Sequence, residues 1–250
     1  MVLALHAKRP SVHYVDSAYY AALAKKARSK YDAVYAKGYR EEDAKGSNHI
    51  SHTEFQDLLA SISGSYAHPI DVLDVGCGTG RYFHALKNVN SLTGIDISVD
   101  MLKHAASPIF YERLPVMPML RCINLTSLDG KPESFDLVYS IGVLAEFMPL
   151  DNFLIDKVLR MLKPGGRFVC TAVSAESVPK PSAKRRVALL TAAFAPAPLR
   201  RKILTHVCEL SLTRTELQVL FAPFSSFTIY PRKLPHTPGN RTHWVITASL

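Results

Sequence analysis

Short apolar runs alternate with amphipathic segments between Pro69 and about Ala172. This alternation is typical of βαβ units, in which parallel strands are joined by helices that pack on the faces of the sheet. The runs predict strands at 70–75, 91–95, 119–123, 135–141 and 167–171, and helices at 80–87, 98–106 and 151–162. The last helix should end at 163–166, Lys-Pro-Gly-Gly, because proline and glycine do not continue it. The pattern predicts an α/β domain.

The chain on either side of this region has a different character. Residues 1–68 are polar, have helical spacing and are rich in tyrosine. From residue 174 the chain becomes rich in proline and alanine and carries basic doublets. The last predicted elements are a helix that begins at a capping box, Thr213 with Glu216, and strands at 227–230 and 243–248.

Composition and charge narrow the class of protein. The chain has 250 residues, of which 48% are apolar and 20% are charged, and this is the composition of a globular protein. Its net charge of +9 first suggests nucleic acid, an anionic membrane or an acidic substrate. Residues 1–176 hold 19 basic and 19 acidic side chains, whereas residues 177–250 hold 11 basic and 2 acidic ones. The excess charge therefore indicates a local preference of one segment, not a general affinity for polyanions.

The four cysteines stand far apart, and the sequence contains no Cys-x-x-Cys pair or Cys/His cluster. We therefore expect neither a metal site nor a disulfide framework. The apolar run at the N-terminus is too short for a signal peptide, and no window approaches the about 18 apolar residues of a membrane-spanning helix. The default expectation is a cytoplasmic location.

The strongest local signal is the glycine-rich segment 72–80, Val-Leu-Asp-Val-Gly-Cys-Gly-Thr-Gly. Glycines after a buried strand allow positive φ angles and let backbone N–H groups approach a ligand closely. A dinucleotide site uses Gly-x-Gly-x-x-Gly, but this loop reads Gly-x-Gly-x-Gly. Asp74 lies two residues before the first glycine, where a carboxylate would repel a pyrophosphate but suit a ligand with an ammonium group.

Together with three later segments, this loop resembles the motifs of class I S-adenosylmethionine-dependent methyltransferases that modify small molecules. The segment 92–98, Leu-Thr-Gly-Ile-Asp-Ile-Ser, is similar to the second motif, 135–141 to the fourth strand, and 159–168 to the helix and turn before the fifth strand. The resemblance implies S-adenosylmethionine as cofactor. The implied cofactor-binding residues are Asp74, Gly76, Cys77, Gly78, Thr79, Gly80, Asp96, Ile97, Met101, Asn124, Leu125, Ser140 and Ile141.

The resemblance also implies the fold and several residue roles. We expect a Rossmann-like, seven-stranded, mostly parallel sheet with an antiparallel C-terminal strand. The implied units are a helical extension or lid (1–68) and a methyltransferase domain (69–250) that contains an inserted substrate cap (174–212). By resemblance, Asp96 accepts hydrogen bonds from the ribose and Met101 packs on the adenine. Many relatives have an acidic residue where this chain has Asn124, whose amide oxygen can still accept from the adenine amine.

Candidates for the acceptor side are fewer. Where many relatives read Leu-Glu-His, residues 144–147 read Leu-Ala-Glu-Phe, which makes Glu146 the candidate general base. The alternative is a carboxylate at the start of a helix. Tyr31, Tyr35 and Tyr39 repeat every fourth residue and so form one aromatic stripe on a helix. The stripe either packs on the sheet or forms a lid in which Tyr35 and Tyr39 contact the donor or the acceptor.

In the segment 174–212, basic doublets that include Arg185 and Arg186 flank an apolar stretch. They could bind an anionic acceptor, rest on an anionic membrane, or belong to a solvated cap. The leading hypothesis is methyl transfer to an O or N atom of a small molecule, anionic or lipid-like. An RNA methyltransferase lacks support from any Asn-Pro-Pro-Tyr type motif, and a non-catalytic scaffold is disfavoured by the intact glycine loop. No pattern indicates an oligomeric state.

Overall fold

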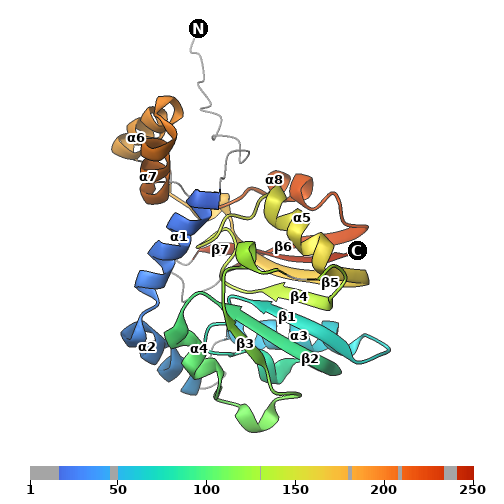
Figure 1. The fold of residues 1–250 in the computed structure, drawn as a ribbon. Helices are drawn as coiled ribbons and strands as arrows, with labels where there is room; N and C mark the ends of the chain where they lie inside the picture. The colour runs from blue at the N-terminus through green and yellow to red at the C-terminus, as the bar shows by residue number, and fades with distance from the viewer. Residues whose placement is uncertain (1–16, 46–49, 130, 180–181, 208–209, 234–240) are drawn as a thin grey trace.

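The computed structural model describes residues 17–45, 50–129, 131–179, 182–207, 210–233 and 241–250. Their strands are β1 (Ile70–Val75), β2 (Val89–Asp96), β3 (Met119–Cys122), β4 (Phe135–Ser140), β5 (Leu162–Val173), β6 (Ser226–Lys233) and β7 (Thr242–Ser249). Within the described part of the chain these strands form one seven-stranded sheet in the order β3-β2-β1-β4-β5-β7-β6 (Figure 1). Only β7 runs against its neighbours, β5 and β6. The predicted Rossmann-like sheet with an antiparallel C-terminal strand is therefore confirmed.

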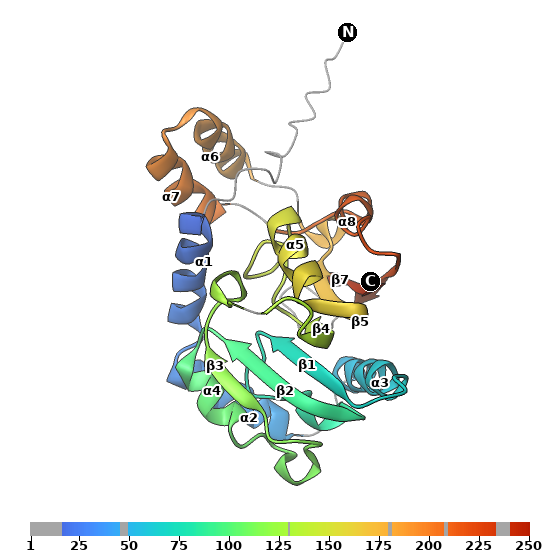
Figure 2. The same cartoon turned by 45° about the vertical axis from the view of Figure 1, so that its right-hand side comes forward.

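The longer helices are α1 (Ser17–Lys30), α2 (Ala33–Ala44), α3 (Ile50–Gly64), α4 (Val99–Ala105), α5 (Asn152–Met161), α6 (Ala183–Phe194), α7 (Ala197–Val207) and α8 (Arg214–Leu220). One face of the sheet packs against α5 and α8, through a cluster that includes Leu154, Val158 and Leu217. The opposite face packs against α3 and α4, through Leu59 and Leu102. Figure 2 shows the sheet lying between these helices. The central strands β1 and β4 are buried on both faces, in keeping with their mainly apolar sequences.

Side chains cap the N-termini of α5 and α8. Asp151 accepts a hydrogen bond from the backbone N–H of Leu154 and begins α5, and Thr213 with Glu216 forms the capping box of α8. Each cap satisfies amides that the first helical turn leaves without a partner.

The helix predicted at 80–87 is wrong. The chain there makes turns and a short 3₁₀ segment, Phe83–Ala85. Only a few residues separate the glycine loop from β2, and Asn88, just before that strand, has a positive φ of 51°. The Phe83 ring is fully buried beneath the loop. Burial of this ring and the early start of β2 leave no room for a regular helix.

Three segments lie outside the layers that cover the sheet. The helices α1 and α2 run along one side of the molecule, over the carboxyl ends of the parallel strands, and the α6–α7 pair stands beyond one end of α1 (Figures 1 and 2). These helices lie within residues 1–68 and 174–212, for which the sequence predicts an extension or lid and a substrate cap. Among the described residues, none of the helices combines the length and apolar character that crossing a bilayer requires.

Candidate functional site

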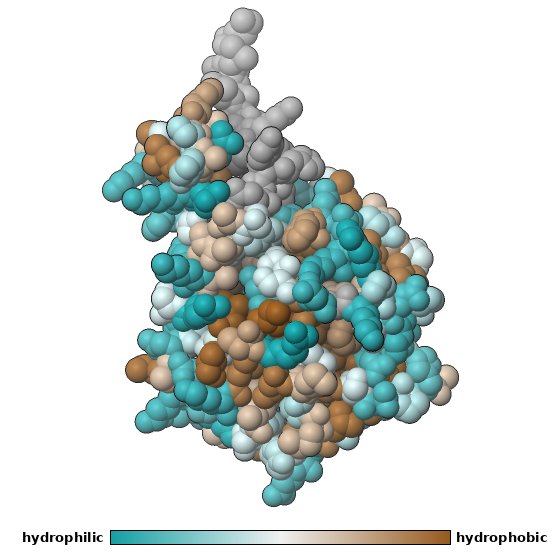
Figure 3. All heavy atoms as spheres, in the orientation of Figure 1, coloured by the Kyte–Doolittle hydropathy of each residue, from teal (hydrophilic) through white to brown (hydrophobic). Residues whose placement is uncertain are grey.

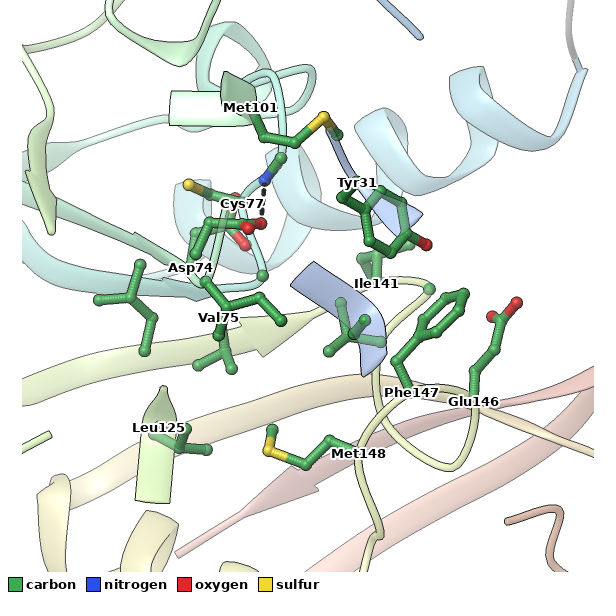
Figure 4. Close-up of a pocket in the computed structure, with 18 of the residues that line it drawn as sticks. Tyr31, Asp74, Val75, Cys77, Met101, Leu125, Ile141, Glu146, Phe147 and Met148 are labelled. Carbon is green, nitrogen blue, oxygen red and sulfur yellow. Dashed lines mark hydrogen bonds between the residues drawn. The ribbon is translucent and has the colours of Figure 1, made fainter. Parts of the chain in front are cut away.

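A pocket of about 360 Å³ opens at the carboxyl ends of β1, β2 and β4, beneath α1 and α2. In open α/β sheets, ligands bind at this edge. Eleven of the residues that the sequence assigned to the cofactor line it: Asp74, Gly76, Cys77, Gly78, Thr79, Asp96, Ile97, Met101, Asn124, Leu125 and Ile141. The close-up in Figure 4 shows several of these side chains converging on the cavity.

The glycine loop is held in a shape that only glycine adopts easily. Gly76 has a φ of 75°, and a side chain there would run into Val143. The backbone N–H groups of Gly76 and Cys77 both donate to the carbonyl oxygen of Ile95, at 2.8 and 3.0 Å. These bonds fasten the loop to the end of β2, so its backbone forms a rigid wall of the pocket.

Two carboxylates stand on either side of this loop, Asp74 buried and Asp96 half-buried. Asp96 accepts hydrogen bonds from the N–H groups of Gly78 at 3.0 Å and Ser98 at 2.8 Å, while burial raises its pKa. Asp74 is 3% exposed, and its burial raises its pKa to about 8. The nearby Asp96 adds to this shift, and the hydroxyl of Tyr139 opposes it. Asp74 is therefore a neutral acid at pH 7 that a cationic ligand would ionise.

Met101 and Asn124, for which the resemblance implies contacts with the adenine, both line the pocket. Met101 is 3% exposed, and its methyl group lies next to Gly78. The side-chain oxygen of Asn124 accepts a hydrogen bond from the N–H of Thr126 at 3.2 Å. This bond orients the amide but uses only one of the two lone pairs of the oxygen, so a second donor can still bind it.

Two predicted cofactor residues do not line the pocket. Ser140 is fully buried, and its hydroxyl donates to the carbonyl oxygen of Val75 at 2.9 Å, which ties β4 to β1. Gly80 lies behind the loop with a φ of 75°, close to the ring of Phe83. Both residues therefore shape the pocket from outside it.

The other end of the pocket is formed by the loop after β4. Glu146 and Phe147 lie on this loop, on the far side of the cavity from Met101 (Figure 4). The Oε2 atom of Glu146 is 3.7 Å from Nε2 of His243, which also lines the pocket. His243 is 1% exposed, and its Nδ1 lies 3.4 Å from the carbonyl oxygen of Arg241. A proton on Nδ1 leaves Nε2 as the basic nitrogen that faces the carboxylate.

His243 has no counterpart in the sequence analysis. It is 97 positions after Glu146 and belongs to no motif. The structure brings it to the pocket because β7 pairs with β5, and His243 is opposite Val173 at the carboxyl end of that strand. Pairing between strands that lie this far apart in the sequence leaves no local signal from which it could be predicted.

The tyrosine stripe forms, although not on one helix. Tyr31 lies in the bend between α1 and α2, whereas Tyr35 and Tyr39 lie on α2. Their rings still follow one another, with centroids 4.8 and 5.7 Å apart, and all three line the pocket. The ring of Tyr31 also meets that of Phe147 at 5.2 Å. Burial raises the pKa of Tyr31, and the charge of nearby Glu146 adds to the shift.

The ammonium group of Lys30 packs against this group of aromatic rings. The ammonium of Lys30 lies 4.7 Å from the ring centroid of Phe147 and about 5.5 Å from those of Tyr31 and Tyr35. Lys30 lines the pocket as the last residue of α1. This end of the pocket thus combines aromatic faces, the ammonium group of Lys30 and the carboxylate of Glu146.

The helix α2 is fastened to the glycine loop by charged groups. Asp43 binds Arg81, with 2.5 Å between oxygen and nitrogen, and accepts a hydrogen bond from the hydroxyl of Thr79. The Arg81 guanidinium lies 4.4 Å from the ring centroid of Tyr39. Only 12% of the Arg81 side chain and 7% of the Asp43 side chain are exposed. Removing either partner would therefore leave the other charge poorly solvated and without compensation. These contacts hold the helix over the end of the pocket that the glycine loop forms.

The two arginines that the sequence assigned to substrate binding lie elsewhere. Arg185 and Arg186 are in the first turn of α6, and neither side chain lines the pocket. In the part of the chain that the structure describes, no group of three or more His, Cys, Asp or Glu side chains could hold a metal ion.

A family model described as a methyltransferase domain matches residues 73–170. Over 132 residues the chain is 34% identical to a demethylmenaquinone methyltransferase of Lactiplantibacillus plantarum, and the match covers 51% of this chain and 54% of that protein. A phosphatidylethanolamine N-methyltransferase of Cereibacter sphaeroides is 31% identical over 98 residues, which are 39% of this chain and 48% of that one. The chain thus spans about half the length of the curated relatives it matches.

Solved structures show the same fold at low sequence identity. A phosphoethanolamine N-methyltransferase 2 of Haemonchus contortus, solved with S-adenosylhomocysteine, has a TM-score of 0.65 and 14% identity, over 95% of this chain and 60% of that one. The magnesium protoporphyrin IX methyltransferase of Synechocystis has a TM-score of 0.58 and 13% identity, over 90% and 99% of the two chains. Residues 73–170 thus match the methyltransferase-domain family, and the order of the strands and the glycine loop beside Asp96 agree with the class I S-adenosylmethionine-dependent methyltransferases that the sequence resembles.

Proposed function

We propose that this protein transfers a methyl group from S-adenosylmethionine to an O or N atom of a small acceptor molecule. The observation that carries the proposal is one continuous pocket, with the glycine loop and Asp96 at one end and Glu146 beside His243 at the other. A donor site and a proton acceptor in one cavity are what this reaction needs.

The residues present suit the donor. The positive-φ glycines leave the loop bare, so a ligand can contact its backbone. Asp74 suits the ammonium group of the donor, and Asp96 has lone pairs left to accept from ribose hydroxyls. Met101 offers an apolar surface to the adenine. When bound, S-adenosylmethionine supplies a methyl group on a positively charged sulfur, from which an acceptor lone pair can displace it.

In this mechanism the chain supplies position, exclusion of water and a base. The lid formed by α1 and α2 covers the pocket, and Tyr31, Tyr35 and Phe147 surround the acceptor with aromatic faces. Holding two reactants at attack distance provides about 7 to 11 kcal/mol of the barrier. Glu146 takes the proton of the attacking hydroxyl or ammonium, and the neighbouring Nε2 of His243 can accept that proton in turn.

The acceptor end favours a molecule with both an apolar and a charged part. Aromatic rings suit the first, and the ammonium of Lys30 suits an anionic group such as a phosphate or an ionised phenol. The names of the relatives agree with this chemistry, since they include a demethylmenaquinone methyltransferase and a phosphatidylethanolamine N-methyltransferase. We therefore infer a small, lipid-like or anionic acceptor.

The test has two stages. Calorimetry with S-adenosylhomocysteine first measures donor binding, and failure to bind would favour the scaffold alternative. Turnover of S-adenosylmethionine is then measured with a panel of quinols, phosphoethanolamines and ethanolamine lipids. With an acceptor found, E146Q should lower kcat about 100-fold or more while donor affinity stays unchanged, because the base acts only in the chemical step.

Control variants separate this role from simple stability. E112Q changes an exposed carboxylate outside the pocket and should behave as the wild type. H243Q should also lower kcat, and the double variant with E146Q should lose little more than E146Q alone, since the two groups act as a pair. Unchanged turnover in E146Q would refute the assignment of the base. RNA binding that falls steeply with salt, together with RNA methylation, would favour the RNA alternative.

A further inference from the structure

We propose that the hairpin formed by α6 and α7 docks this protein on the surface of an anionic lipid bilayer. The hairpin presents the largest apolar side chains that the described part of the cap region leaves in solvent. Val187 is 62% exposed, Leu190 59%, Phe194 90% and Leu199 49%. A cluster of large apolar side chains that are this exposed indicates a binding surface for a membrane, a protein or a ligand.

Three of these side chains form a stripe along α6. Val187, Leu190 and Phe194 follow a spacing of three and four residues, which places them on one face of the helix. Leu199 adds a further apolar group from the first turn of α7. In Figure 3 the hairpin projects from the body with brown apolar side chains between teal polar ones. An exposed stripe of this kind can sink into the boundary between lipid headgroups and acyl chains.

Basic side chains lie on both flanks of the stripe. Helical spacing puts Lys184 on one side of Val187 and Leu190 and puts Arg186 on the other, and both basic residues are exposed. Lys202 is exposed on α7. The sequence from 177 to 208 contains seven basic residues and no acidic one. Long basic side chains beside an apolar stripe can reach up to anionic headgroups while their stems contact the apolar surface.

The opposite side of the hairpin is already used for packing. Ala192 and Ala195 are buried, and the guanidinium Nε of Arg200 donates to the carbonyl oxygen of Ala192 at 3.1 Å, joining the two helices. The ammonium of Lys26 on α1 donates to the carbonyl oxygen of Thr205 on α7 at 2.9 Å. The hairpin is therefore fixed to α1, a helix that also lines the pocket, so docking would bring the bilayer close to the acceptor site.

Charge and exposure favour a bilayer over the other occupants. A two-fold contact between copies would place one positively charged stripe against another, and like charges oppose such a contact. An RNA backbone would use the basic side chains but would gain little from an outward-facing phenylalanine that is 90% exposed. An anionic bilayer uses both kinds of side chain at once.

Flotation with lipid vesicles tests the proposal on the full chain, without donor or acceptor, so its outcome does not depend on the proposed methyl transfer. We expect binding to phosphatidylcholine vesicles that contain phosphatidylglycerol, and at least tenfold weaker binding to phosphatidylcholine alone. L190S/F194S should weaken binding about 100-fold, because two apolar side chains that would enter the bilayer are lost. K184Q/R186Q should weaken it about 25-fold. These side chains are exposed or half-exposed, so both variants should keep the wild-type melting temperature and donor affinity.

V34S is the matched control, because Val34 is 82% exposed on α2, away from the hairpin. It should bind vesicles as the wild type does. Equal binding of wild type and L190S/F194S, or no binding to anionic vesicles, would overturn the proposal. Self-association in analytical ultracentrifugation that disappears in L190S/F194S would also overturn it, because the stripe would then be an interface between copies. Binding to RNA that is lost in both double variants, without vesicle binding, would overturn it in favour of nucleic acid.

Discussion

The buried acid Asp74 should make donor binding depend on pH. Its pKa is raised to about 8, so at pH 7 only about a tenth of the molecules carry the ionised form, and ionising the rest costs about 1.4 kcal/mol. A bound ammonium group stabilises the carboxylate and expels the proton. Affinity for S-adenosylhomocysteine should therefore rise about tenfold for each pH unit between about 5.5 and 7.5, where the ligand's own amino group stays protonated. Above the pKa of Asp74 this gain stops.

Calorimetry across this range, in buffers with different ionisation enthalpies, measures both the affinity and the number of protons released. We expect release of nearly one proton per donor bound at pH 6.5. D74N should abolish the slope and the release, because an amide cannot ionise, and the side chain keeps nearly the same size. A flat affinity between pH 5.5 and 7.5 in the wild type would refute the reasoning, and so would the same slope in D74N, which would place the titrating group elsewhere.

Two further predictions concern the rigidity of the donor site. G80A should destabilise the fold by about 3 kcal/mol in chemical denaturation, because a Cβ atom at a φ of 75° would stand 2.7 Å from the ring of Phe83; G38A, at an open position on α2, should be neutral or slightly stabilising. D43N should weaken donor binding at least tenfold in calorimetry by leaving the buried Arg81 with a weaker partner, and unchanged affinity would mean that α2 does not need this ion pair to cover the site.

The sequence was sufficient for the parts of the protein whose signals are local. The buried strands β1 and β4 have apolar patterns that a parallel sheet imposes on any chain. The glycine loop and the acid at the end of β2 follow one another within about twenty residues, and their roles depend on short backbone turns. The caps of α5 and α8 are likewise determined within one helical turn.

The tertiary structure decided what depends on contacts between distant segments. The pattern at 80–87 suits a helix, but burial of Phe83 beneath Gly80 and the early start of β2 produce a 3₁₀ turn instead. The tyrosine stripe survives a break between two helices because ring packing, not helical periodicity, joins Tyr31 to Tyr35.

The same reason explains the acceptor end of the site. Glu146 could be proposed from its place after β4, but its neighbour His243 enters the pocket only through the pairing of β5 with β7. The basic cap showed its charge in the sequence, yet its position outside the pocket and its exposed apolar stripe follow from how α7 packs on α1. Short-range patterns are set by backbone geometry and burial along one element, whereas neighbours far apart in the chain are chosen by the packing of whole elements.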